Sequence, residues 1–248
     1  DADGSGDANR RAAGLVLGGL GGEGGGDRAL LRRLDARKVL VVRGTYDRVE
    51  DTLALLGIRH DTLTPEEVAV APLPPDAILV VDCDADPLPP DACRAVRAFV
   101  HSGGYLCTTD WGLENVLEKS FPGILRSLAR DGAGLSTQNE VVKMRVSAPG
   151  HALVRGIRAV SDDAAWWVED QAHPVEVVDR ERVTVLAESA EFRKRYRSGV
   201  LAATFGFGKG KVLHLLGHAW QKEGNLKGTY ALQRMILNFL VDRAGTLE

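Results

Sequence analysis

The stretch GGYLCTTDWGLENVL, from Gly103 to Leu117, decides the fold of this chain. Its two glycines mark a turn, YLCTT has the composition of a buried strand, and a helical pattern begins directly after Asp110. A strand that runs into a helix at a tight corner is typical of the βαβ units of parallel sheets. Some enzymes carry their nucleophile at such a corner, so the same stretch raises the question of chemistry.

Strand and helix patterns also alternate on the N-terminal side of this stretch. KVLVV (38–42) and AILVVDCD (77–84) each contain a continuous apolar run, as expected of strands that are buried on both faces. DRVEDTLALLG and PLPPDACRAVRAFVHSGG have helical periodicity, and each ends in glycine. This alternation predicts an α/β fold with a doubly wound, flavodoxin-like, mostly parallel sheet.

The C-terminal half is expected to be richer in strands. Four segments fit strands: VVKMRVS, VTVLAES, GVLAATF and KVLHLLGH. The last two are joined by the hairpin-type turn GFGKG, and TYALQRMILNFLVDR then predicts an amphipathic helix that packs back on the sheet.

Glycine-rich sequence at the N-terminus predicts a tail before the domain. Residues 1–37 contain GLVLGGLGGEGGG, and glycine at that density costs much backbone entropy in any regular element. We therefore expect a tail or linker with a short lead-in helix at 1–37, one domain at 38–243 and a C-terminal tail at 244–248. The chain starts with Asp1, which favours a processed or trimmed N-terminus.

Composition excludes several classes of protein. With 248 residues and a net charge of -3, the chain offers no general electrostatic case for nucleic acid binding. The short basic cluster RKRYR (193–197) is interpreted as a solvated face. No apolar run is long enough to span a membrane. The cysteines Cys83, Cys93 and Cys107 fit neither a disulfide framework nor a zinc pattern, which favours reduced thiols in a cytoplasmic protein. The sequence predicts no cofactor and no metal site, and it leaves the oligomeric state open.

Polar and aromatic side chains follow four of the predicted strands. In an open parallel sheet, ligands bind outside the carboxyl ends of the strands. The candidate ligand-binding residues at these ends are Arg43, Tyr46, Asp82, Asp84, Trp111, Trp220 and Gln221. In AAWWVEDQAHPVEV, adjacent strand residues point to opposite faces, so Trp167 is a further candidate; alternatively, both tryptophans pack in the core.

The order of elements, with VHSGGYL before the corner and GKGKVLHLLGH near the end, resembles the class I glutamine amidotransferase-like superfamily. The resemblance covers roughly residues 38–242 and is strongest to the branch that keeps the fold without the glutaminase triad. Active members carry a cysteine at the corner, a histidine, and a glutamate two residues after the histidine. Here the corner position falls on Asp110, Cys107 lies three residues earlier, His218 matches the histidine, and Trp220 stands in place of the glutamate. The resemblance therefore implies that the thiolate nucleophile and the acid that orients the histidine are missing.

Three hypotheses about function follow. The favoured one is a non-catalytic module that binds a protein partner or a small polar ligand within a larger assembly. The second is a hydrolase-type enzyme with a rebuilt site, in which Asp110 and His218 are catalytic and Arg43 holds an anion. The third is binding of a carbohydrate or another small polar ligand without turnover. Asp110 could also simply cap the helix that follows it, and His218 could be a structural histidine.

Overall fold

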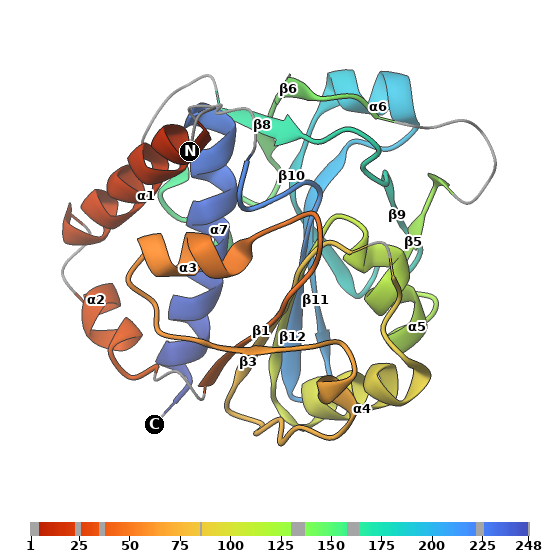
Figure 1. Cartoon of the computed structure of the whole chain (residues 1–248). Coiled ribbons are helices and arrows are strands. Elements are labelled where there is room, and N and C mark those ends of the chain that lie inside the picture. Colours follow the sequence, from red (N-terminus) through yellow and green to blue (C-terminus); the bar gives the residue numbers. More distant parts are fainter. Residues whose placement is uncertain are drawn as a thin grey trace.

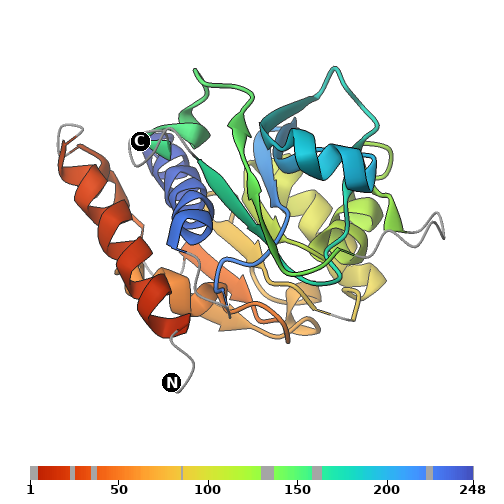
Figure 2. The ribbon, with the colours of Figure 1, turned by 90° about the horizontal axis from the view of Figure 1, so that it is seen from above.

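The computed structural model describes residues 5–22, 26–34, 38–84, 86–129, 137–157, 164–221 and 226–247. Parts of the predicted tails, at 1–4, 23–25, 35–37 and 248, lie outside the described residues. A central sheet stands between two layers of helices, as two perpendicular views show (Figures 1 and 2). The fold is therefore α/β with a doubly wound sheet, as predicted.

The central sheet has eight strands among the described residues. Their order is β2 (Asp61–Leu63), β1 (Val39–Val42), β3 (Ile78–Val81), β4 (Tyr105–Thr109), β12 (Gly210–Leu215), β11 (Val200–Phe207), β10 (Val183–Glu188) and β7 (Arg145–Val146). From β2 to β12 neighbouring strands are parallel, and the last three strands are added antiparallel. The mostly parallel sheet is confirmed, whereas the greater β content of the C-terminal half stays a prediction.

Helices cover both faces of this sheet (Figures 1 and 2). On one face lie α1 (Ser5–Gly22), α2 (Gly26–Leu31), α3 (Val49–Leu55) and α7 (Leu226–Gly245); on the other lie α4 (Pro90–Ser102) and α5 (Glu118–Ser120). Because α7 continues to Gly245, part of the predicted C-terminal tail at 244–248 is helical. None of the described helices is both long and apolar enough to cross a membrane.

Two hydrophobic cores explain why the central strands are continuous apolar runs. Val39 and Val41 of β1 belong to the core under α7, and Leu40 and Val42 belong to the core under α4. Successive strand residues point to opposite faces, so a strand that is covered on both sides must be apolar at every position.

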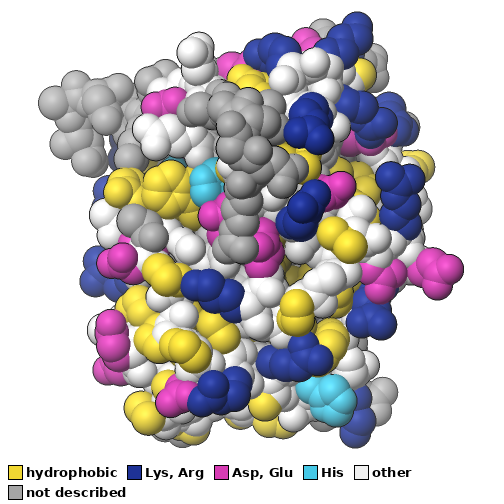
Figure 3. All heavy atoms as spheres, turned by 90° about the vertical axis from the view of Figure 1, so that its right-hand side faces the viewer, with side chains coloured by type: hydrophobic (Ala, Val, Ile, Leu, Met, Phe, Trp, Pro, Cys, Tyr) yellow, Lys and Arg dark blue, Asp and Glu magenta, His cyan; other side chains and the backbone are white. Residues whose placement is uncertain are grey.

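Shorter elements stand beside the main sheet. They are the two-stranded sheets of β5 (Leu125–Ser127) with β9 (Val175–Val177) and of β6 (Glu140–Lys143) with β8 (Ala165–Val168), the helix α6 (Ala190–Tyr196), the 3₁₀-helices η2 (Glu67–Ala69) and η5 (Ala152–Val154), and the π-helical turn η3 (Leu113–Leu117). Lys and Arg side chains gather on part of the surface viewed in Figure 3, mixed with acidic and hydrophobic ones. Within the predicted basic cluster, Arg193 pairs with Glu188 at 2.5 Å, and Arg195 pairs with Glu140. Much of the positive charge of this cluster is therefore balanced locally.

The prediction of an irregular glycine-rich tail at the N-terminus is wrong for residues 5–22, which form helix α1. This helix packs along α7 and buries Ala12, Val16 and Leu20 (Figure 2). Asn9 also forms two hydrogen bonds with the backbone of Gln221, at 2.9 and 3.3 Å. Glycine costs a helix about 1 kcal/mol per residue. Burial against α7 supplies the stability that the local sequence lacks.

Candidate functional site

The loops that leave β1 and β3 pack closely at one edge of the sheet. The backbone N–H of Tyr46 donates to the carbonyl of Cys83 at 3.1 Å. A Cβ atom placed on Gly44 would lie only 2.2 Å from the same carbonyl oxygen, so this approach requires glycine. We call the carboxyl ends of β1, β3, β4 and β12, with the loops that leave them, the rim.

Asp110 occupies the corner between β4 and the following helical turn. Its φ of 40° lies in the left-handed region, which is uncommon for a residue other than glycine. The corner is fixed by hydrogen bonds from the Asp110 N–H to Leu215 at 2.9 Å and from the Leu113 N–H to the Asp110 carbonyl at 3.0 Å. The helical turn that follows has no side-chain cap, and the carboxylate instead accepts from the N–H of His173 at 3.2 Å. Asp110 is therefore not a helix cap.

His218 lies between two carboxylates. Its Nε2 is 3.4 Å from Oδ2 of Asp110, and its Nδ1 is 3.4 Å from Oε1 of Glu169. All three side chains are buried. Burial lowers the pKa of His218, but Asp110, Cys83 and Glu169 outweigh it and hold the pKa well above its usual value. The imidazole is therefore protonated at neutral pH, between two acidic groups.

Glu169 corrects the expectation that His218 has no acidic partner. Trp220 does stand where the resemblance would put a glutamate, but a carboxylate reaches the ring from the end of β8 instead. Glu169 lies 49 positions before His218 in the sequence, in no recognisable motif. Only the three-dimensional fold brings it to the histidine.

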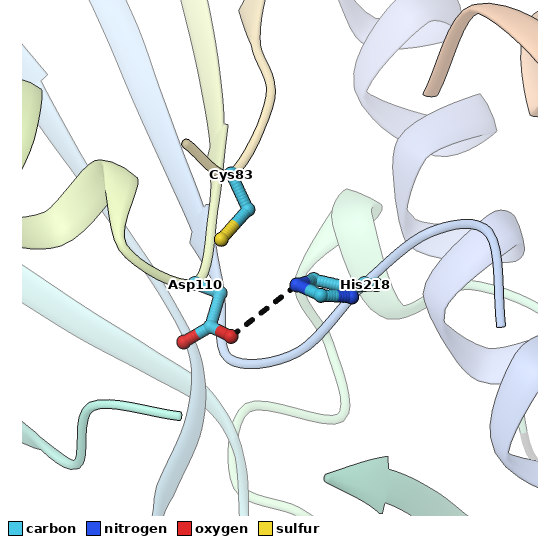
Figure 4. Close-up of side chains that lie close together, drawn as sticks. All are labelled: Cys83, Asp110 and His218. Carbon is cyan, nitrogen blue, oxygen red and sulfur yellow. Dashed lines mark ion pairs between the residues drawn. The ribbon is translucent and has the colours of Figure 1, made fainter. Parts of the chain in front are cut away.

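Cys83 is the second residue of this site that the sequence did not indicate. Its Sγ, a carboxylate oxygen of Asp110 and a ring nitrogen of His218 all lie within 4.8 Å of one another, and Figure 4 shows the three side chains close together. Burial raises the pKa of Cys83 to about 11, although the neighbouring His218 acts in the opposite direction. Cys83 is therefore a thiol at neutral pH, and so is Cys107, whose pKa is raised by complete burial and then by Asp82 and Asp47.

Asp82, a predicted ligand-binding residue, forms a buried acidic pair with Asp47 beside this site. Burial, then Asp47 and Glu50, raise its pKa well above the usual value for an aspartate. Asp47 is equally buried, but it accepts hydrogen bonds from the N–H groups of Ala219 at 2.9 Å and Trp220 at 3.0 Å. These contacts tie the loop after β1 to the loop after β12, which indicates a structural role.

Tyr46 and Trp111 of the rim form an aromatic cluster with His173, which lies in the loop after β8. The rings of Trp111 and His173 stack with centroids 5.3 Å apart, and Tyr46 meets Trp111 edge to face at 5.2 Å. The indole N–H of Trp111 donates to the carbonyl of Gln171 at 2.8 Å, which fixes the ring. Tyr46 is 37% exposed and Trp111 is half-buried, so the cluster has an accessible surface.

The other rim candidates do not converge with Asp110 and His218. Arg43 is exposed and pairs with Glu50 at 3.2 Å. Asp84 accepts from the hydroxyl of Thr45 at 3.2 Å. The guanidinium carbon of Arg48 lies 5.1 Å from the centre of the Trp220 ring, so the cation covers this indole.

Gln221 and Trp167 lie in the interior. The Gln221 side chain accepts from Thr229 at 2.7 Å and is completely buried beneath α1. Trp166 and Trp167 are both buried, and the N–H of Trp166 donates to Leu216 at 2.6 Å. Of the two alternatives for the tryptophan pair, packing in the core is the one observed.

No protein-family model and no curated protein sequence matches this chain. Solved structures do resemble it. A ThuA-like protein from Parabacteroides merdae matches with a TM-score of 0.57 at 14% identity, and the match covers 83% of this chain and 88% of that protein's chain. A ThuA-like protein from Bacteroides uniformis has a TM-score of 0.53 at 12% identity over 82% and 90% of the two chains. A cytoplasmic protein from Salmonella typhimurium has a TM-score of 0.53 at 14% identity over 82% and 97%. ThuA-like proteins have a class I glutamine amidotransferase-like fold, so the predicted resemblance is confirmed for the fold.

Proposed function

We propose that this chain is a non-catalytic amidotransferase-like module that binds a small polar ligand or a protein partner at its rim. The observation that carries the proposal is the corner residue, Asp110, which is buried and paired with a protonated His218. A carboxylate cannot act as the thiolate nucleophile of a glutaminase. An imidazole that already carries both protons cannot serve as a general base.

The aromatic cluster of Tyr46, Trp111 and His173 is the proposed contact surface. Aromatic rings give a large contact area at low entropic cost, and Asp84 adds an accessible carboxylate at the same rim. This combination suits sugars and other polar ligands, and it equally suits a peptide segment of a partner protein. We propose residues 38–243 as the domain that carries this surface, with α1 packed against it.

Two measurements test the proposal together. Ammonia release from glutamine should stay at the level of a buffer blank, because the nucleophile is missing. A pull-down with the purified chain should retain a partner or ligand that Trp111→Ala loses. Val70→Ala is the matched control, because Val70 is 84% exposed and is not part of the rim. Clear glutaminase activity, or retention that Trp111→Ala leaves unchanged, would contradict the proposal.

A hydrolase is the second candidate, favoured by the φ of 40° at Asp110 and by the acid on the far side of His218. In that mechanism a carboxylate oxygen of Asp110 attacks an electrophilic carbon and displaces a leaving group, which forms an ester. His218, after losing one proton, would activate water to attack the ester carbonyl, so that a water oxygen enters the Asp110 carboxylate. The probes are haloalkanes and epoxides in ¹⁸O-labelled water. Label in the peptide that contains Asp110 would favour the hydrolase over the binding module.

A further inference from the structure

Cys83, Asp110 and His218 bring three different donor atoms to one buried point. They follow three neighbouring parallel strands, β3, β4 and β12, so the topology of the sheet gathers them. We propose that these three side chains form a binding site for a zinc-type divalent transition metal ion. This inference goes beyond the proposed binding function, and it departs from the sequence-based expectation that no metal site is present.

The distances suit a small tetrahedral site. Two ligand atoms at about 2.0–2.3 Å from a tetrahedral metal lie roughly 3.4–3.6 Å apart. His218 Nε2 and Asp110 Oδ2 are 3.4 Å apart. All three donor atoms lie within 4.8 Å of one another, so a movement of the thiol by at most about 1 Å would complete the set.

The chemistry of the donors selects the class of metal. A thiolate and an imidazole favour zinc and its neighbours in the first transition series, whereas magnesium and calcium prefer oxygen ligands. Three protein ligands also match the common arrangement in which a fourth position is left to water.

The unsatisfied ring nitrogens of His218 are a second, independent observation in favour of a metal site. The side chain is more than nine-tenths buried, yet within the described part of the chain neither ring nitrogen has a hydrogen-bond partner of normal geometry. Both carboxylates face the ring at 3.4 Å, which is long for an N–H···O hydrogen bond. A metal ion on Nε2 would satisfy one nitrogen, and Nδ1–H would then donate to Glu169. A carboxylate on the other nitrogen is the usual partner of a metal-bound histidine.

Charge and protons balance when the metal ion binds to the three side chains. Binding replaces the thiol proton of Cys83 and one proton of the His218 imidazolium by the metal dication, and the carboxylate of Asp110 keeps its charge. The three side chains together are neutral before binding, and with the metal they remain neutral. Nothing is oxidised or reduced, and the two protons leave to solvent.

Cobalt(II) is the probe, because a thiolate ligand gives a charge-transfer band in the near ultraviolet and tetrahedral geometry gives strong visible bands. We expect both bands when the full chain is refolded with cobalt(II), and their loss when zinc(II) is added. Cys93→Ser and Cys107→Ala should keep the bands, because neither thiol is part of the site. Cys83→Ser should lose the charge-transfer band. Glu169→Gln should keep it and weaken the affinity about 10- to 100-fold.

Circular dichroism of each variant separates loss of the site from loss of the fold. If Cys83→Ser does not fold, the bands of the wild type together with those of Cys93→Ser and Cys107→Ala assign the thiolate by elimination. A folded wild type without a charge-transfer band would overturn the proposal. A folded Cys83→Ser variant that keeps the band would overturn it as well.

Discussion

The carboxylate of Glu169 lies 3.4 Å from Nδ1 of His218, on the side of the ring opposite Asp110. The resemblance would take the acid from two residues after the histidine, and here it comes from the end of a different strand. Glu169, His218 and Asp110 therefore follow one another as the acid, the histidine and the corner residue do in a glutaminase triad. The difference in residue type is at the corner, where an aspartate stands in place of a cysteine.

Replacing Asp110 by cysteine tests this alignment directly. The new thiol would stand at the corner beside an imidazolium that Glu169 supports, and a positive neighbour lowers the pKa of a thiol. We expect Asp110→Cys to react with iodoacetamide at least about tenfold faster at neutral pH than the buried thiols of the wild type, as measured by mass spectrometry of the labelled peptide.

The double variant Asp110→Cys/His218→Gln is the control. It keeps the thiol and removes the positive charge, so its labelling should become slow again. Equal labelling of the single and the double variant would mean that His218 does not act on the corner position.

The pH dependence of stability should contain a contribution from His214. Burial, reinforced by His173, lowers the pKa of His214 to about 3 from the usual 6.5. Between these values the unfolded chain binds a proton that the folded chain does not. Stability is therefore lost as pH falls below 6.5, at a rate approaching about 1.4 kcal/mol per pH unit from this one group.

Urea unfolding of the wild type and of His214→Gln, at about pH 7 and about pH 5, measures this contribution. His214 also bonds to the hydroxyl of Thr108 at 2.9 Å, so the variant should be less stable at neutral pH. Its stability should nevertheless change less between the two pH values. Parallel pH profiles of the two proteins would contradict the assignment.

The parallel core of the fold was predictable because its signal is local. The runs at 39–42 and 77–81 are apolar at every position, as strands that are covered on both faces require. Helix α1 was not predictable, because its glycines disfavour a helix and the stabilising contact is with α7, more than 200 residues away in the sequence. The short strands β5 and β9 likewise depend on pairing that no local pattern encodes.

The candidate site was predictable only in part. Asp110 and His218 follow strands that the sequence marks clearly, and the structure brings them together. Arg43 was expected beside them, but its charge is directed to Glu50 instead. Neither Cys83 nor Glu169 belongs to a recognisable sequence motif. Their places in the site depend on the order of the strands and on the path of the loop after β8.

The contact between α1 and α7 makes a further prediction. Val16 is completely buried against this interface, whereas its neighbour Leu15 is 44% exposed. Val16→Asp places a charge in an apolar layer and should lower the free energy of unfolding by about 2–4 kcal/mol. Leu15→Asp makes a similar substitution one position away and should change stability by about 0.5 kcal/mol or less. Similar melting temperatures for the two variants would show that α1 contributes little to the fold.

The approach of the β1 loop to Cys83 gives the last prediction. In Gly44→Ala the new Cβ would lie 2.2 Å from the carbonyl oxygen of Cys83, and this atom belongs to the backbone and cannot rotate away. The loop must therefore move, which should cost about 1–3 kcal/mol and should make the Cys83 thiol more reactive toward a disulfide reagent. Gly150→Ala is the matched control, because nothing lies within 4 Å of the added Cβ. Equal thiol reactivity in both variants would mean that Gly44 does not help to keep Cys83 buried.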